Sequence, residues 1–547
     1  MKSSKLKKIC AVALTFALGM TVLAGCSGNK ADAGQTLIYN LGADPKTIDP
    51  ALNEAVDGST IIVNTFEGLC RLDENEKAIP GVAKEWKISD DGKVYTFNLR
   101  DDAKWSDGQA VTAKDFEYAW KRALDPKTAA AYAYQLYYIK GAEAFNTGKG
   151  SADDLGIKVI DDKTLEVTLE NSTPYFLELM AFATYMPVRQ DIIEANGDTW
   201  TQSPETYVSN GPFKMQEWAM KEKIVLGKNE NYWNKDSVKL DTLDIRLGTD
   251  EVSAYAELKA GNFHMTDTIP VEEMEQAKTD GLYQQYPNLA TYFFCFNVGN
   301  NVDKIDPAIE KALGNKKVRQ ALSIAIDRQS IVDNITKAGQ VPAYSFVPEG
   351  IEVVAGKDFA DKKYYDVKGD LEKAKALLVE AGYPNGEGFP KMTILINSEG
   401  TGHKNIAQYL QDTWKKIGID VEIQNQEWQV FQSTRNEGNF QIARHGWSGD
   451  YVDPMTFLDM WTSASGSNDV GLKNAEYDET IKLAKGEADP AKRAELFRKA
   501  EDILMDEAAV IPLYYYTKVK GVDPKVKGFR VSTLGQVYFD EAYVEAK

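Results

Sequence analysis

Three side chains in the stretch Asn439–Trp461 have types that suit ligand binding and no structural role that the sequence explains. They are the guanidinium of Arg444, the indole of Trp447 and the carboxylate of Asp450. By contrast, Asp453 precedes a proline and an apolar run, a pattern typical of a helix N-cap. One free cation and one free anion beside aromatic residues suit a zwitterionic ligand that carries apolar side chains.

The strand that leads to these side chains is predicted from alternation. Phe440 and Ile442 alternate with polar residues, which predicts a strand that ends near His445. Gly446 and Gly449 then break the pattern, so Arg444, Trp447 and Asp450 are expected at the carboxyl end of this strand and on the turn that follows.

The segments before this strand predict a mostly parallel sheet. They read in the order strand, helix, strand, helix: Lys391–Asn397, His403–Lys416, residues 419–423 and Glu427–Glu437. Such an order is typical of parallel strands joined by right-handed crossovers. Ligands bind these sheets at the carboxyl ends of the strands, where the 397–403 loop and the 444–450 turn are expected.

The amino terminus has the features of a secretory leader. Four lysines precede a short apolar run that ends in Leu-Ala-Gly-Cys, which resembles a bacterial lipobox. Residues 1–25 are therefore predicted to be removed, Cys26 to carry lipid and residues 26–34 to form a tether. The alternative, an uncleaved signal anchor, does not require small residues at both Ala24 and Gly25.

Length, charge and cysteine content narrow the class of protein. A chain of 547 residues with 43% hydrophobic residues can build more than one core, and nothing after the leader is apolar enough to span a membrane. Removing residues 1–25, which hold four lysines and no acid, changes the net charge from −19 to −23. This charge disfavours nucleic acid and anionic lipid as partners, although simple solubility also explains it. Cys70 and Cys295 have no spacing that demands a disulfide, so we expect two free, buried thiols.

Motifs for catalysis, metals and cofactors are absent from the sequence. It has no G-x-S-x-G elbow, no H-E-x-x-H and no phosphate-binding lysine loop. His264, His403 and His445 are too dispersed to predict a metal site. The loop Gly400–Asn405 follows a strand and opens a helix, but it lacks the third glycine of a dinucleotide-binding loop. We therefore predict no metal, no cofactor and no enzymatic activity.

Motifs along most of the chain closely resemble those of one family. They are DPKTIDPAL, LCRLDEN, PGVAKEW, DGKVYTFNLRDDAKWSDGQAVTAKDFEYAWKRALDP, TPYFLELMAF, SNGPFKMQEW, KNENYW, VRQALSIAIDRQSIV, PAYSFVP, NQEWQVF and GWSGDYVDPMTFL. Together with the lipobox they resemble the oligopeptide-binding lipoproteins of ATP-driven peptide importers, in the peptide/nickel class of solute-binding proteins. The similarity spans nearly the whole mature chain.

This resemblance implies an α/β fold with two lobes that close around an extended peptide. The expected fold is like that of periplasmic binding proteins of class II type, with an additional domain inserted in one lobe. The expected boundaries place lobe I at residues 35–72, 206–290 and 518–547, the inserted middle domain at 73–205 and lobe II at 291–517.

The resemblance also assigns roles to charged residues. The family's aspartate in the GW-x-x-DY motif pairs with the amino group of the peptide, and it falls on Asp450. The neighbouring family arginine and tryptophan fall on Arg444 and Trp447. A second arginine and a histidine fall on Arg435 and His403, and these basic groups can meet the carboxylate of a peptide of suitable length.

Further roles concern the peptide backbone and side chains. The family's pocket-lining tryptophan falls on Trp428, and Asp44 stands in the place of a family acid near the peptide backbone. Independently of the family, a ligand of arbitrary sequence has to be held by groups that all peptides share. Backbone groups from Gly446 to Ser448 can pair with it as an added strand.

The resemblance implies partners and a location as well. The protein is expected to be a monomer held on the outer face of a bacterial cell membrane by lipid on Cys26, and to deliver an oligopeptide to permease and ATPase subunits. The chain departs from many relatives by having Cys295 in place of an acid and His445 in place of an alanine or similar residue, so the pocket preferences of relatives should not be transferred.

Other ligands and another class of protein remain as alternatives. The ligand could be a dipeptide, a cell-wall peptide, a signalling peptide or a metal chelate, although scarce histidine argues against direct nickel ligation. A surface peptide hydrolase would use Asp450 and Asp453 as acids, but the capping role of Asp453 and the lack of a nucleophile argue against it. An adhesin would show no thermal shift with small molecules.

Overall fold

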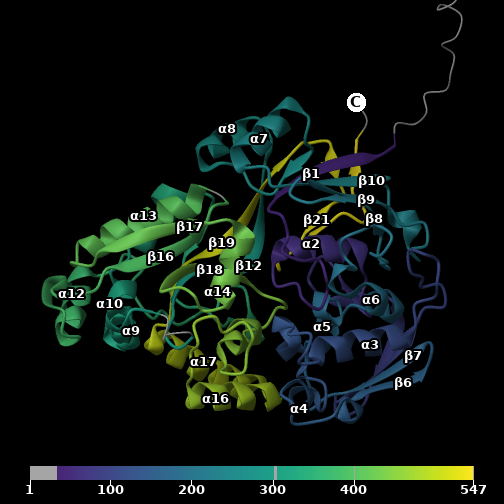
Figure 1. Cartoon of the computed structure of the whole chain (residues 1–547), viewed down its shortest axis with the longest axis horizontal. Coiled ribbons are helices and arrows are strands. Elements are labelled where there is room, and N and C mark those ends of the chain that lie inside the picture. Colours follow the sequence, from purple (N-terminus) through teal and green to yellow (C-terminus); the bar gives the residue numbers. More distant parts are fainter. Residues whose placement is uncertain (1–33, 301–304, 400, 546–547) are drawn as a thin grey trace, which may run out of the picture. The chain divides into compact units, whose positions relative to one another are not determined.

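A computed structural model describes residues 34–300, 305–399 and 401–545, and the residues from Thr36 onward form one compact unit (Figure 1). The predicted leader and the predicted lipidation site Cys26 lie outside the described residues. Among the described residues, no helix has the length and apolar character that a membrane span requires.

An eleven-stranded mixed sheet is the largest element of the structure. Its strands are, in spatial order, β17 (Val421–Gln426), β16 (Met392–Asn397), β18 (Ile442–Ser448), β12 (Tyr283–Phe296), β19 (Val510–Val522), β11 (Met265–Thr266), β1 (Thr36–Gly42), β10 (Thr242–Leu247), β9 (Lys223–Lys228) and β8 (Phe213–Ala219), and β13 (Val341–Pro342) pairs with β19. Figure 1 shows β16, β17 and β18 on one side of the central pair β12 and β19, and β1 and β8–β10 on the other.

The predicted strand-helix-strand-helix-strand order is confirmed. Parallel strands β16 and β17 are joined by α13 (Thr401–Lys415), and α14 (Trp428–Asn436) leads from β17 to β18. The predicted end of the last strand near His445 is wrong. β18 continues through Gly446 to Ser448, because its antiparallel pairing with β12 persists as far as the pair Ala290 and Ser448.

The central strands are longer than the apolar patterns predicted. We expected strands at Thr291–Asn297 and Pro512–Tyr516, whereas β12 has 14 residues and β19 has 13. The polar ends of both strands pair with each other, from Tyr283 opposite Gly521 onward, and this pairing extends them beyond their apolar centres.

A second, antiparallel sheet lies within residues 73–205. Its order is β4 (Ala83–Ile88), β5 (Val94–Leu99), β7 (Thr164–Thr168) and β6 (Ile157–Asp161). The sequence predicts two hairpins here, at residues 85–99 and 157–169, and their strands are close to those observed. Thr112 and Asp115 have the sequence spacing of a helix capping box, and α3 (Ala113–Leu124) begins with one, because Asp115 accepts a hydrogen bond of 2.8 Å from the Thr112 backbone.

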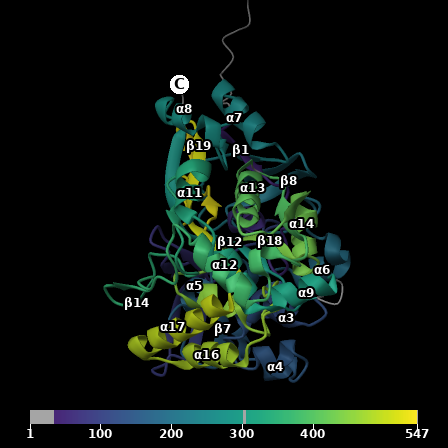
Figure 2. The same ribbon diagram turned by 90° about the vertical axis from the view of Figure 1, so that its left-hand side faces the viewer.

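The remaining helices cover the sheets and carry loops toward the cavity described below. The longer ones are α2 (Val56–Thr65), α6 (Gln190–Asn196), α7 (Glu251–Ala260), α8 (Met274–Thr279), α9 (Pro307–Gly314), α10 (Lys316–Ile324), α12 (Leu371–Glu380), α16 (Ala475–Gly486) and α17 (Pro490–Glu507). Figure 2 shows α16 and α17 packed side by side. The sequence predicts Asp327 and Asp370 as helix N-caps, and both side chains accept a backbone N–H in the first turn of the helix that follows.

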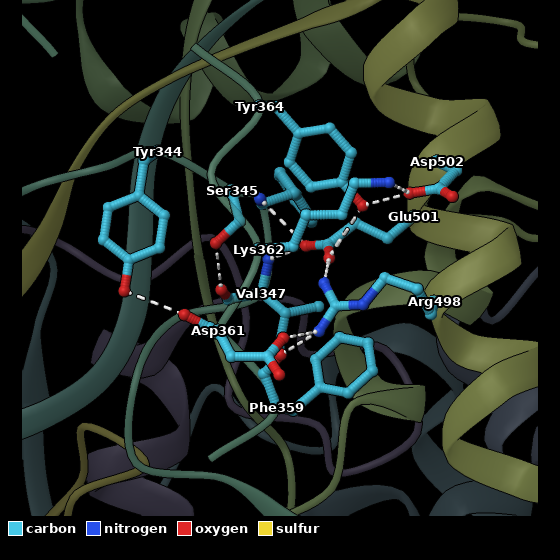
Figure 3. A network of polar contacts seen from close by, with 12 residues as sticks. Tyr344, Ser345, Val347, Phe359, Asp361, Lys362, Tyr364, Arg498, Glu501 and Asp502 are labelled. Carbon is cyan, nitrogen blue, oxygen red and sulfur yellow. Dashed lines mark hydrogen bonds and ion pairs between the residues drawn. The ribbon is translucent and has the colours of Figure 1, made fainter. Parts of the chain in front are cut away.

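A buried carboxylate on α17 anchors the loop that crosses this helix. The fully buried Glu501 accepts hydrogen bonds from the backbone N–H groups of Phe346 (3.1 Å) and Val347 (2.9 Å) (Figure 3). Arg498 donates to it at 2.9 Å, and the Tyr364 hydroxyl lies at 3.3 Å. Burial raises the pKa of Glu501 to about 7, while these donors favour its charged form.

We expect Glu501→Ala to loosen this loop and to lower the free energy of unfolding by roughly 2–5 kcal/mol, because two buried N–H groups and one guanidinium lose their acceptor. Denaturant unfolding measures the energy, and hydrogen exchange of residues 343–365 measures the loop. Glu495→Ala, at an exposed position of the same helix, is the matched control. Unchanged exchange in the loop of Glu501→Ala contradicts the anchoring role.

Candidate functional site

All nine residues that the sequence predicts for the ligand site line one cavity of about 960 Å³. They are Asp44, His403, Trp428, Arg435, Arg444, Gly446, Trp447, Ser448 and Asp450. They come from distant segments: the loop after β1, the start of α13, α14 and the end of β18. The cavity therefore depends on the whole fold and not on one motif.

The end of β18 presents to this cavity a backbone edge that no described strand pairs with, although the Gly446 N–H makes a local hydrogen bond of 2.7 Å to Nδ1 of His445. Gly449 donates its N–H to the carbonyl of Leu289 in β12, and Asn297, which directly follows β12, donates its N–H to the carbonyl of Gln441. Because such pairs alternate along an antiparallel ladder, the backbone groups of Gly446 and Ser448 point away from β12. On that side β16 pairs with β18 only at Ile442 and Ala443, so no described strand covers the last residues of β18.

A side chain at position 446 would disturb the wall of the cavity. A Cβ atom added at Gly446 would lie 2.7 Å from the hydroxyl oxygen of Tyr516. The contact is with the far end of a flexible side chain, so a larger residue would displace Tyr516 from the cavity wall.

Asp450 is a carboxylate without a cation. Its Oδ2 accepts a hydrogen bond of 2.8 Å from Gln135, its Oδ1 lies 3.5 Å from the Tyr132 hydroxyl, and its N–H donates to Thr456 at 2.9 Å. No ion pair joins it to a basic group in the described part of the chain. Burial, reinforced by the charge of Asp459, raises the pKa of Asp450 well above its usual range.

Arg444 lies in an aromatic environment that contains no acid partner. It donates to the Tyr516 hydroxyl at 3.1 Å, and its guanidinium carbon lies 5.1 Å from the ring centroid of Tyr292. His403 stacks on Tyr292, with ring centroids 5.6 Å apart. Burial and the charge of Arg444 lower the pKa of His403 well below its usual range, so this imidazole is neutral near pH 7. The two basic side chains thus supply one positive charge, on Arg444.

Arg435 differs from Arg444 because it already has an acid partner. Its Nε lies 2.6 Å from Asp469, whose carboxylate is also 3.4 Å from His445. Burial, and the positive charge of Arg435, lower the pKa of His445 to about 4, which leaves this ring neutral. Arg435 is therefore less available to bind a ligand carboxylate than the sequence predicts, because its guanidinium is already paired with Asp469.

The face of α14 that lines the cavity bonds to residues from the N-terminal part of the chain. Trp428 donates its indole N–H to Asp57 at 2.7 Å, and Gln429 donates to the Asp44 carboxylate at 3.2 Å. Asn436 donates to Glu54 at 2.6 Å. Trp428 and Asp44 are brought to the same wall of the cavity by these bonds.

The indole of Trp447 packs parallel to Tyr132, with ring centroids 6.0 Å apart, and its buried N–H has no hydrogen-bond partner among the described residues.

Asp453 keeps a structural role as predicted, but the helix after it, α15 (Met455–Leu458), starts one residue later than expected. The Asp453 carboxylate accepts a hydrogen bond from the Met455 N–H and pairs with Arg493, so it is unsuited to act as a free acid.

Sequence reasoning missed four residues that shape the site: Gln135, Tyr132, Asp57 and Asp469. Each is far from its partner in the sequence, and a single glutamine or aspartate carries no local signal.

The expectation for the cysteines is confirmed, since Cys70 and Cys295 are free and buried. In the described part of the chain, no group of three His, Cys, Asp or Glu side chains is placed to hold a metal ion.

Comparisons with known proteins identify the family. The family model described as "Bacterial extracellular solute-binding proteins, family 5 Middle" matches residues 77–469. The oligopeptide-binding protein OppA of Bacillus subtilis (strain 168) is 41% identical over 529 residues, which cover 94% of this chain and 94% of that protein.

Solved structures match nearly the whole described chain. Listeria monocytogenes OppA bound to peptide gives a TM-score of 0.86 at 30% identity and covers 94% of this chain and 100% of that chain. The murein tripeptide-binding protein MppA of Escherichia coli gives 0.86 at 32% identity, with 94% and 99% covered. MppA in its unliganded open form gives 0.62 at 32% identity, with 94% and 98% covered.

These likenesses confirm the expected α/β fold with two lobes and an additional domain. The chain belongs to the bacterial extracellular solute-binding proteins of family 5.

Proposed function

We propose that this protein is the extracytoplasmic binding component of an ABC importer, and that it captures short oligopeptides in extended form. The observation that carries the proposal is the free carboxylate of Asp450 at the end of the free edge of β18. One relative is named an oligopeptide-binding protein, and a similar solved structure is described as bound to peptide, which supports the same ligand class.

The site matches the groups that all peptides share. Asp450 can receive the terminal ammonium through a charge-assisted hydrogen bond. The backbone groups of Gly446 and Ser448 can pair with an extended ligand as in strand addition. Arg444, which has no acid partner, is the receptor for a carboxylate, and neutral His403 beside it can add a hydrogen bond.

Side-chain tolerance follows from the size and polarity of the cavity. A volume of about 960 Å³ leaves room for water around a short peptide. Bridging waters replace direct hydrogen bonds at modest cost, so different side chains can be accommodated. We therefore expect weak selectivity by sequence and strong dependence on a free amino terminus.

The lobe boundaries given above remain part of this proposal, with residues 73–205 as the inserted domain. The boundary at residue 290 falls within β12, where the pairing with β19 is irregular between Pro287 and Thr291. Such an irregularity suits a hinge, because local bending there breaks few ladder hydrogen bonds. The higher TM-score to one MppA structure than to its open form supports an arrangement closer to closure.

Attachment to the membrane rests on the sequence. We propose that the chain is cleaved before Cys26, carries lipid on that cysteine and works as a monomer on the outer face of a bacterial cell membrane. From there it would deliver peptide to permease and ATPase subunits.

Native mass spectrometry of the purified mature chain tests the ligand class. We expect a heterogeneous set of short peptides with free amino termini to be released on denaturation. A single peptide would favour a dedicated receptor for a dipeptide, a cell-wall peptide or a signalling peptide, and a metal chelate would contradict the peptide assignment. Cleavage of an added peptide would favour the hydrolase alternative.

We expect Asp450→Asn to weaken binding of a free-amine peptide by at least about 1.5 kcal/mol, since the variant loses a charged hydrogen-bond acceptor. Isothermal titration calorimetry measures this difference. Glu479→Gln, an exposed change on α16 that also removes one negative charge, controls for net charge. Equal affinity of Asp450→Asn and the unchanged protein would remove Asp450 from the site.

The pH dependence of binding should reflect the raised pKa of Asp450. An ammonium ligand requires the carboxylate form, so affinity should fall as the pH drops through that pKa, at values above the ordinary aspartate pKa of about 3.9. Calorimetry between pH 4 and pH 7 checks the profile, and Asp450→Asn should flatten it. A profile that is the same in both proteins contradicts the assignment.

A further inference from the structure

Two of the side chains that approach the carboxylate of Asp450 come from one short segment. Gln135 and Tyr132 both lie on the 3-10 turn η1 (Ala131–Leu136), within residues 73–205, whereas Asp450 follows β18. The amino-group receptor of the proposed site is thus assembled from two parts of the chain more than 300 residues apart in sequence. Either part alone leaves it incomplete.

Gln135 is held in place mainly by its own surroundings. Its side chain is fully buried, and its backbone carbonyl accepts a hydrogen bond of 2.6 Å from the Tyr185 hydroxyl, which belongs to the same domain. Its amide Nε2 donates to Asp450 Oδ2 at 2.8 Å, while its Oε1 has no partner among the described residues. Burying an amide with only half of its hydrogen bonds made is unfavourable, so its direction toward Asp450 calls for a functional reason.

The two oxygens of Asp450 are bonded unequally. Oδ2 has the short bond from Gln135, whereas the Tyr132 hydroxyl lies 3.5 Å from Oδ1, the long limit of a hydrogen bond. A further side-chain hydrogen bond, from Thr456, also favours the charged form of the carboxyl and lowers its pKa. Tyr132 is also fixed by packing parallel to Trp447. The pattern leaves Oδ1 as the oxygen with free acceptor capacity toward a ligand.

We propose that Gln135 is a positioning residue for the amino-terminal subsite, which holds Asp450 Oδ2 so that Oδ1 faces the ligand ammonium. This inference rests on the proposed function and deepens it. Recognition of a free amino terminus then requires η1 to be docked against the end of β18. An open arrangement that separates these segments has a misoriented Asp450 and discriminates poorly between free and blocked amino termini.

Other charged and polar groups lie near Asp450, and the test has to distinguish their effects from that of Gln135. Asp459 contributes a second negative charge, Tyr134 and Tyr132 contribute neutral phenols, and Thr456 is bonded to the Asp450 backbone. Of these groups, Gln135 makes the shortest side-chain contact with the carboxylate. Its donated hydrogen bond favours the charged form and lowers the pKa of Asp450 against the larger effect of burial.

The test compares one peptide with its N-acetylated form by calorimetry in Gln135→Met, which keeps side-chain length and removes the donor. We expect affinity for the free-amine peptide to fall roughly tenfold, the size of one hydrogen bond to a charged group, and affinity for the acetylated peptide to change little. The ratio of the two dissociation constants should therefore shrink roughly tenfold. The pH at which free-amine binding is lost should rise, which a purely structural role of Gln135 does not produce.

Tyr137→Phe, which removes a hydroxyl bonded to Asn146 next to the same turn, is the matched control and should leave the ratio unchanged. If Gln135→Met does not fold, Gln135→Leu removes the same donor. An unchanged ratio in a folded Gln135 variant overturns the inference, and the proposed function stands if Asp450→Asn still weakens binding. Unchanged binding in Asp450→Asn overturns both.

Discussion

The cost of removing a carboxylate from water governs the arrangement of this site. Asp450 is surrounded by protein, has another acid nearby and receives hydrogen bonds but no positive charge. A carboxylate in that setting is held at high free energy until a cation arrives. The structure around it, from the edge of β18 to the tyrosines of η1, places no basic side chain of the described residues in an ion pair with it.

Two arginines of the cavity, Arg435 and Arg444, differ in whether an acid neutralises them, and this difference separates their roles. Arg435 is neutralised by Asp469, so it contributes to the rigidity of the wall. Arg444 is surrounded by phenol rings and a neutral imidazole, which stabilise a cation through their π-electrons and oxygens without cancelling its charge. Asp450 and Arg444 thus present opposite charges to the cavity with no ion-pair partner among the described residues, and a zwitterion is a class of molecule that satisfies both.

Much of the fold around the site was predictable from local sequence. Alternation and helical periodicity predicted β16, α13, β17, α14 and β18, and unassigned charges in a glycine-rich segment indicated Arg444 and Asp450. The end of β18 was misjudged because Gly446 looks like a break, while the register with β12 carries the strand through it. Gln135 and Asp469 could not be predicted, since their importance arises only when distant segments meet, and neither position has a local pattern. The ion pair between Arg435 and Asp469 could not be predicted for the same reason.

The two long strands at the centre of the sheet also set how the cavity can change size. β12 and β19 run side by side across the middle of the sheet, with β18 and its helices on one flank and β11 and β1 on the other. A slide of one of these strands along the other by one residue would turn its side chains to the opposite face of the sheet. A change in cavity size that keeps the pairing of β12 with β19 is therefore a bend of the pair and not a slide of one strand along its neighbour.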